Sequence, residues 1–268
     1  MIRYIFIALL LLSGAIPVLG QELYVNTEPA SNMATRSLGI RLENQGFDKN
    51  DFKNRTSLEL MYGASKNLMV HTTFYASNYY QPGQRFEGIS AYAKYRFLAI
   101  DSVQRHFRGA IFAKVASISN PLNNQEITLE GDNSGIQGGV VFTQLLHKVA
   151  LSASGGYLRA FDNRGAYSLP VNNSRDEVFY TLSAGYLLFP EIYRDYTQVN
   201  VNLYAELLGK TNPGYGQSYL DAAPAVQFIF NSVFRVDVSY RAPLYNHMRR
   251  NSQNTYLLRL EYNFFNVF

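Results

Sequence analysis

Apolar and polar residues alternate one by one along most of this chain. Near its end, Leu258, Leu260 and Tyr262 are separated by Arg259 and Glu261. Because successive side chains of a strand point to opposite faces, a period of two residues predicts half-buried β-strands. The pattern predicts about twelve strands, at residues 38–43, 57–62, 67–75, 89–97, 107–115, 136–143, 149–157, 178–188, 198–207, 220–230, 234–241 and 256–268.

The connections between these runs distinguish a membrane barrel from a soluble β-sandwich, which would also alternate. A bacterial barrel with both ends in the periplasm has long outer loops and short inner turns. The expected outer loops are 44–53, 77–85, 119–134, 162–175, 209–218 and 243–254, and the expected inner turns are 63–66, 100–105, 145–148, 190–195 and 231–232. Each expected outer loop is longer than every expected inner turn. The sequence therefore predicts an all-β fold, a transmembrane antiparallel up-and-down β-barrel.

The composition supports a wall that faces lipid. Charged residues make up 16% of the chain, against about 25% in ordinary soluble domains. Aromatic residues make up 15%, with 21 Tyr, 18 Phe and no Trp. Many of them fall near the ends of predicted strands, where membrane barrels carry aromatic belts; these are Tyr62, Tyr95, Phe97, Tyr157, Tyr180, Phe228, Tyr256 and Phe264. A barrel explains this composition, and after the first twenty residues no run approaches the ~18 apolar residues of a membrane helix.

The first twenty residues have the features of a cleaved secretory signal. Arg3 precedes the apolar run Ile5–Leu12, which is too short to span a bilayer, and Pro17 follows it. We expect residues 1–20 to be removed, residues 21–34 to form a short periplasmic N-terminal segment, and residues 35–268 to form the barrel. The alternative for residues 21–34 is a partial plug inside the lumen. The chain has no Cys, which excludes a lipoprotein anchor.

The last strand ends on Phe268, with aromatic residues at alternating positions upstream. This arrangement resembles the C-terminal signature of bacterial outer-membrane β-barrel proteins. Residues 27–34 are also similar to the N-terminal region of an uncharacterised, porin- or transporter-like group of these barrels. The resemblance implies a barrel surrounded by lipid in the outer membrane of a Gram-negative bacterium, and it implies no particular activity.

Polar side chains are costly in lipid, so the polar positions of the strands must face the lumen. The expected pore-lining residues carry both signs of charge, and they are Arg41, Glu59, His71, Lys94, Arg96, Arg108, Lys114, Glu206, Asp221, Arg235, Asp237, Arg241, Arg259 and Glu261. Lys94, Arg96, Arg108 and Lys114 lie on adjacent predicted strands, which favours an anion-tolerant stripe that Glu59 would partly neutralise.

Two interpretations of this lumen remain open. The mixed charges could form an internal salt-bridge lattice that fills a structural or accessory barrel of a larger envelope complex. They could instead line a narrow channel for small polar or anionic solutes. A barrel of about twelve strands lies between filled eight-stranded barrels and wide porins. We therefore predict the channel, with a small solute and envelope proteins as possible partners.

Other classes of function find little support. The chain has four His: His106 and His147 fall in expected inner turns, His247 in an outer loop, and His71 on the lumen wall. None pairs with a nucleophile in a recognisable pattern, so we expect no enzyme, an outer-membrane hydrolase being the third alternative. The acidic residues Glu126, Glu130 and Asp132 lack the spacing of a calcium loop. We expect no metal, cofactor or nucleic-acid partner, since the net charge of +4 is small and dispersed.

Overall fold

A computed structural model describes residues 24–48, 52–103, 105–165, 167–192 and 197–267. The predicted signal peptide, residues 1–20, and the C-terminal Phe268 lie outside the described residues. Within the described part of the chain, no helix has the length and apolar character needed to cross a membrane. The described residues form twelve strands: β1 (Leu38–Asp48), β2 (Phe52–Gly63), β3 (Leu68–Ser77), β4 (Arg85–Ser102), β5 (Arg105–Ile118), β6 (Gly135–Leu146), β7 (Val149–Ala160), β8 (Asp176–Phe189), β9 (Asn200–Asn212), β10 (Gln217–Phe230), β11 (Phe234–Asn246) and β12 (Thr255–Phe264).

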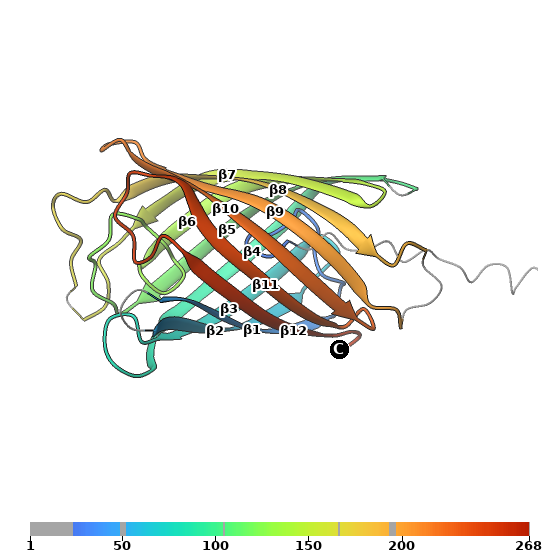
Figure 1. Ribbon diagram of the computed structural model, residues 1–268, viewed down its shortest axis with the longest axis horizontal. Helices are drawn as coiled ribbons and strands as arrows, with labels where there is room; N and C mark the ends of the chain where they lie inside the picture. The colour runs from blue at the N-terminus through green and yellow to red at the C-terminus, as the bar shows by residue number, and fades with distance from the viewer. Residues whose placement is uncertain (1–23, 49–51, 104, 166, 193–196, 268) are drawn as a thin grey trace, which may run out of the picture.

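Each strand pairs antiparallel with its neighbours in the sequence, and β1 pairs with β12 to close the sheet into a barrel (Figure 1). The register of the closing pair places Arg41 of β1 opposite Glu261 of β12, while Glu59 of β2 lies on its other side. Closure leaves no sheet edge with unpaired backbone groups, which is the condition for a β-structure to exist in lipid. The predicted all-β, up-and-down antiparallel barrel is confirmed.

The outward side chains of the wall are apolar, while the inward ones are mostly polar. Leu182, Val115 and Ile111 are 55%, 51% and 48% exposed although they lie in the middle of strands. Their sequence neighbours Ser183 and Lys114 point inward and are largely shielded from solvent. A continuous apolar surface of this kind is unfavourable in water and favourable in contact with lipid hydrocarbon.

Several strands extend beyond the expected ends, so the prediction that every outer loop exceeds every inner turn is wrong. β1 and β2 are joined by residues 49–51 and β9 and β10 by residues 213–216, whereas the inner connection between β8 and β9 spans residues 190–199. The ladder continues through pairs such as Gly46 with Asn54. At these strand ends both faces carry polar residues, so alternation no longer marks where the strand stops.

Two segments fold into the barrel. The first, residues 24–34, is named the plug and is the blue trace inside the barrel in Figure 1. Its Tyr24 and Val25 are buried against inward side chains such as Tyr204 and Leu257. The described residues 24–34 therefore lie in the lumen, as in the alternative of a partial plug, because their apolar side chains and backbone groups find partners there.

The second segment, residues 119–134, connects β5 to β6 and is named the roof loop. It turns inward instead of extending away from the barrel. Its side chains Leu122, Ile127 and Leu129 are buried in one cluster with Leu158 and Phe179 of the wall. Burial of apolar surface thus holds this loop across the lumen.

Candidate functional site: a cavity between the plug and the roof loop

The plug is held mainly by one buried carboxylate, that of Glu206 on β9. Its Oε1 accepts hydrogen bonds from the backbone N–H groups of Val25 and Asn26, at 3.1 and 2.8 Å. Its Oε2 accepts a hydrogen bond of 2.7 Å from the hydroxyl of Thr27, which also lies 2.9 Å from Ser183 Oγ. Backbone N–H groups inside a protein need acceptors, and a charged acceptor gives the stronger bonds.

Further along the plug, the wall supplies donors for its carbonyl groups. Lys94 is fully buried, and its ammonium donates to the carbonyl oxygens of Pro29 and Ser31, at 2.6 and 2.9 Å. The N–H of Ala30 donates to Thr143 Oγ1 at 2.9 Å, and Arg108 donates to Ser31 Oγ at 2.9 Å. Side chains of β4, β5, β6, β8 and β9 therefore bind the plug, and residues 25–28 of the plug line the cavity described next.

The roof loop is held by ion pairs between its acidic residues and cations of the wall. Glu126 lies 3.2 Å from Lys210 and accepts a hydrogen bond of 2.7 Å from Tyr219. Glu130 lies 3.3 Å from Lys114. The third acid of the loop, Asp132, pairs with Arg55 of β2.

Two of these acids, Glu126 and Glu130, are kept ionised by the cations around them. Burial would raise the pKa of Glu126, but the positive charges of Lys210, Arg241 and Arg250 lower that pKa to about 2. The charge of Lys114 lowers the pKa of Glu130 as well, against the opposing effect of burial. The roof loop is thus fixed by charges that remain in place over the ordinary range of pH.

Between the plug and the roof loop lies a cavity of about 280 Å³. One side is apolar and aromatic, formed by residues such as Phe112, Leu158 and Phe179. The remaining wall is charged, and it includes both ends of several ion pairs. A second cavity of about 70 Å³ lies between the roof loop and the connection that precedes β12. The two cavities share lining residues of the roof loop and of the barrel wall, namely Gln45, Arg55, Glu126, Thr128, Glu130 and Arg241.

A lattice of ion pairs joins β1, β2, β11 and β12 inside the barrel. Arg41 donates to Glu59 at 2.9 Å and to Glu261 at 2.7 Å. The other close pairs of the lattice are Arg235 with Asp237 (3.1 Å) and Glu261 (2.7 Å), and Arg259 with Glu43 (2.6 Å) and Asp237 (3.5 Å). Nearby, Asp221 pairs with both Arg241 and Arg250. Such alternation of signs offsets the cost of burying each charge.

The expected pore-lining residues all occupy inward positions of the wall, but they divide into two groups. Those that line the larger cavity are Arg41, Glu59, His71, Lys114, Arg241 and Arg259. Those that do not line it bind the plug, belong to ion pairs or contact other parts of the wall, and they are Lys94, Arg96, Arg108, Glu206, Asp221, Arg235, Asp237 and Glu261. The alternation of the strands gives the direction of a side chain, whereas access to the cavity depends on what covers it.

The predicted cationic stripe is divided among separate partners. Lys94 binds the plug, Arg96 donates to the carbonyl of Lys66, and Arg108 lies 3.1 Å from Asp101. Glu59, which is expected to neutralise part of the stripe, makes its close ion pair with Arg41 of β1. The structure thus leaves Lys114 as the member of the stripe that reaches the cavity.

Sequence reasoning also missed residues that shape the site. Lys210 was placed in an expected outer loop, although it lies on β9 and points inward. Glu126 and Glu130 lie in an expected outer loop, and the apolar Ile127 and Leu129 between them are the signal that this loop turns inward. His106 is on β5, not in a turn, and its Nδ1 lies 2.8 Å from Asp101.

No family model matches the chain, and no curated protein matches it. Solved structures do resemble it. A KdgM porin aligns over 85% of this chain and 99% of its own, at 13% identity and a TM-score of 0.51. The COG4313 outer membrane channel from Pseudomonas putida F1 aligns over 91% of this chain and 100% of its own, at 11% identity and a TM-score of 0.54.

An outer membrane phospholipase A from Escherichia coli aligns with a TM-score of 0.44 at 9% identity, over 93% of this chain and 95% of its own. That score is too low to bear on activity. The two better alignments extend over nearly the whole barrel, and at such low identity they bear on architecture alone. The chain therefore shares the β-barrel fold of outer-membrane channels.

Proposed function

We propose that this chain spans the outer membrane and forms a narrow, gated channel for small polar or anionic solutes. The observation that carries the proposal is the charged cavity of about 280 Å³ held between the plug and the roof loop. Its volume is at the lower end of the ~300–1,000 Å³ usual for small-molecule sites. It therefore suits one small solute and not a long polymer.

The route of the solute follows from the two adjoining cavities. The smaller one begins among residues of the last outer loop, such as Asn251 and Ser252, and shares the acids of the roof loop with the larger one. An anionic solute that enters here meets Lys114 and Lys210, which Glu130 and Glu126 neutralise in this state. A carboxylate or phosphate of the solute can replace Glu130 or Glu126 as the partner of these lysines. Because one negative charge replaces another, the electrostatic cost of entry is limited.

The plug then acts as the inner gate. Its contacts with the wall are nearly all polar, and its apolar contribution is limited to a few side chains, of which Tyr24 and Val25 are the largest. Polar contacts exchange readily with water when a segment moves. Residues 24–34 can therefore leave the lumen while the closed ladder of the barrel stays intact.

A structural barrel with a filled lumen is the second candidate. The ion-pair lattice and the plug favour it, because together they cover most of the inward charges. On either candidate we propose no enzyme; the close side-chain partners of His71 and His106 are the carboxylates of Glu59 and Asp101. Envelope partners remain part of this second proposal.

A reversible cross-link of the plug distinguishes the two candidates. Thr27 Oγ1 and Ser183 Oγ are 2.9 Å apart, and the chain has no Cys of its own, so the double variant Thr27→Cys/Ser183→Cys can form one disulfide between the plug and β8. In planar bilayers we expect no conductance from the oxidised variant and step conductance after reduction. The single variant Thr27→Cys, treated in the same way, is the control.

The outcomes separate gating from conduction. Equal conductance before and after reduction would show that the plug does not control the channel. If neither the unmodified protein nor the reduced variant conducts at any voltage, the channel itself is wrong and the structural barrel is favoured.

A further inference from the structure

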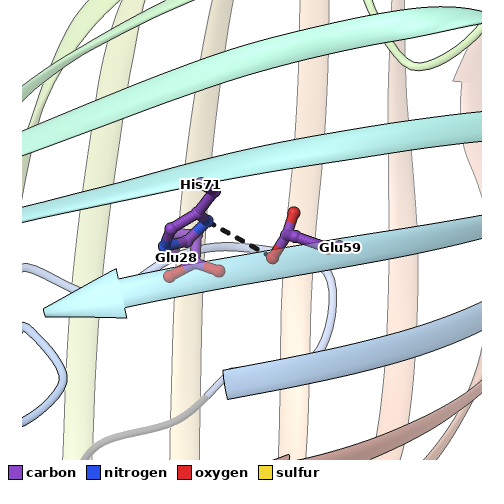
Figure 2. Close-up of side chains that lie close together, drawn as sticks. All are labelled: Glu28, Glu59 and His71. Carbon is purple, nitrogen blue, oxygen red and sulfur yellow. Dashed lines mark ion pairs between the residues drawn. The ribbon is translucent and has the colours of Figure 1, made fainter. Parts of the chain in front are cut away.

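Three side chains from three segments converge at the wall of the larger cavity. Glu28 comes from the plug, Glu59 from β2 and His71 from β3, and Figure 2 shows the two carboxylates and the imidazole pointing toward one another. One ligand atom from each of the three lies within 4.8 Å of the other two. His71 Nδ1 is 3.3 Å from Glu59 Oε1.

The imidazole of His71 has a ring nitrogen that is available to bind a ligand. The side chain is 3% exposed, and among the described residues its Nε2 has no hydrogen-bond partner. The hydroxyl of Tyr92, whose ring centroid is 5.0 Å from that of His71, is also buried without a hydrogen-bond partner. Buried polar atoms are normally satisfied, so two unsatisfied groups side by side at a cavity indicate a ligand.

A cation already holds the two carboxylates together. Arg41 Nη1 is 3.0 Å from Glu28 Oε1 and 2.9 Å from Glu59 Oε1. The Nε of the same guanidinium makes a separate contact of 2.7 Å with Glu261. Arg41 can therefore release Glu28 and Glu59 and still keep its place in the lattice. The position of its Nη1 is the place where a positive charge is attracted by both carboxylates.

We propose that Glu28, Glu59 and His71 form an exchangeable site for a divalent transition metal of the Zn²⁺ class. One imidazole with two carboxylates is a donor set that suits such ions, with a fourth position left for water. Bonds of about 2.0–2.2 Å in tetrahedral geometry require ligand atoms roughly 3.4 Å apart. His71 Nδ1 and Glu59 Oε1, at 3.3 Å, already have this spacing, so Glu28 is the group that moves. Glu28, whose side chain is 32% exposed, can make this movement.

The site has a consequence for the gate because its ligands come from both sides of it. Glu28 belongs to the plug, whereas Glu59 and His71 belong to the wall. A metal bound by all three residues replaces the contact of Arg41 with the two carboxylates by three coordinate bonds. It thereby fixes the plug to β2 and β3. This consequence rests on the proposed gating, whereas the binding of metal does not.

The test is a titration of the refolded, full barrel with ZnCl₂ by calorimetry, with a parallel Co²⁺ titration that reports coordination geometry in the visible spectrum. We expect one ion per barrel. His71→Ala is expected to weaken Zn²⁺ binding at least about tenfold. Loss of a group that only hydrogen-bonds to a metal ligand already costs about 10- to 100-fold in metal affinity, and loss of the ligand itself costs no less. His247→Ala in the exposed last outer loop controls for binding at surface histidines.

A second variant keeps the test valid if His71→Ala disturbs packing. Arg41→Met removes the cation that contacts both carboxylates, whereas Lys94 Nζ, 3.6 Å from Glu28 Oε2, stays in place. This variant is expected to tighten Zn²⁺ binding, the opposite sign to any general loss of structure. No binding to the unmodified barrel, unchanged affinity in His71→Ala, or weaker binding in Arg41→Met would each overturn the site. Binding is measured without conductance, so failure of the channel proposal would leave this result interpretable.

Discussion

Charged residues of the same sign on adjacent strands have different surroundings in this barrel. Lys114 points into the larger cavity, where its ammonium meets Glu130 of the roof loop at 3.3 Å. Arg96 occupies an inward position on the adjacent strand but donates to the backbone of Lys66, away from the cavity. A permeating ion therefore experiences the charge of Lys114 at contact distance and that of Arg96 through intervening protein.

This difference predicts separate effects on ion selectivity. Lys114→Gln leaves Glu130 without its cation and is expected to lower the anion-to-cation permeability ratio by about twofold or more. Arg96→Gln, the matched control, is expected to leave the ratio unchanged. Reversal potentials in a salt gradient measure both, and equal shifts in the two variants would contradict the assignment of Lys114 to the route.

Among the elements, the roof loop depends most on charge. Glu126 has a pKa of 4.5 as a free carboxyl and about 2 in the folded protein, where burial is outweighed by Lys210, Arg241 and Arg250. A lowered folded pKa means that the carboxylate stabilises the fold at pH values above the unfolded pKa. As the pH falls below about 4.5 the unfolded chain takes up the proton first, and the contribution is lost as the pH passes through about 2.

The measurable result is a pH-dependent difference between the unmodified protein and Glu126→Gln. We expect the difference in free energy of unfolding to be constant above about pH 5, at up to roughly 3 kcal/mol, and to shrink between pH 4.5 and pH 2. Urea unfolding at several pH values checks this. A difference that stays the same down to pH 2.5 would show that Glu126 is not the group responsible.

The strands and their facing directions were accessible from the sequence, whereas the contents of the lumen were not. Alternation identified every strand and set residues such as Arg41 and Arg259 on the inner face, because lipid on one side and polar groups on the other impose a period of two. It could not show that residues 24–34 enter the lumen or that the roof loop turns inward. Those segments have no period, and their positions follow from contacts such as that of Glu206 with Asn26, between residues far apart in the chain.

At the scale of the whole molecule, the distribution of polarity is the reverse of that in a soluble protein. Apolar side chains such as Leu182 and Leu258 are exposed on the outside, and charges such as Lys94 and Glu206 are buried inside. Hydrocarbon around the barrel makes this arrangement favourable, because it accepts the apolar surface and excludes the charged one.

A charge placed on the outer wall tests that environment. Leu182 is 55% exposed in the middle of β8, and Leu182→Arg is expected to lower the free energy of unfolding in lipid by about 2–4 kcal/mol, the cost of Arg at the bilayer midplane. Val171→Arg, at a site 94% exposed in an outer connection, is expected to have little effect. Reversible folding into vesicles measures both, and a neutral Leu182→Arg would argue against burial of this face in lipid.

The origin of the plug at the beginning of the described chain imposes an order on assembly. Its partners include Lys94 on β4, Thr143 on β6, Ser183 on β8 and Glu206 on β9, so it has no complete binding surface until strands synthesised much later have come together. The segment that precedes every strand therefore completes its contacts only after the wall from β4 to β9 has formed.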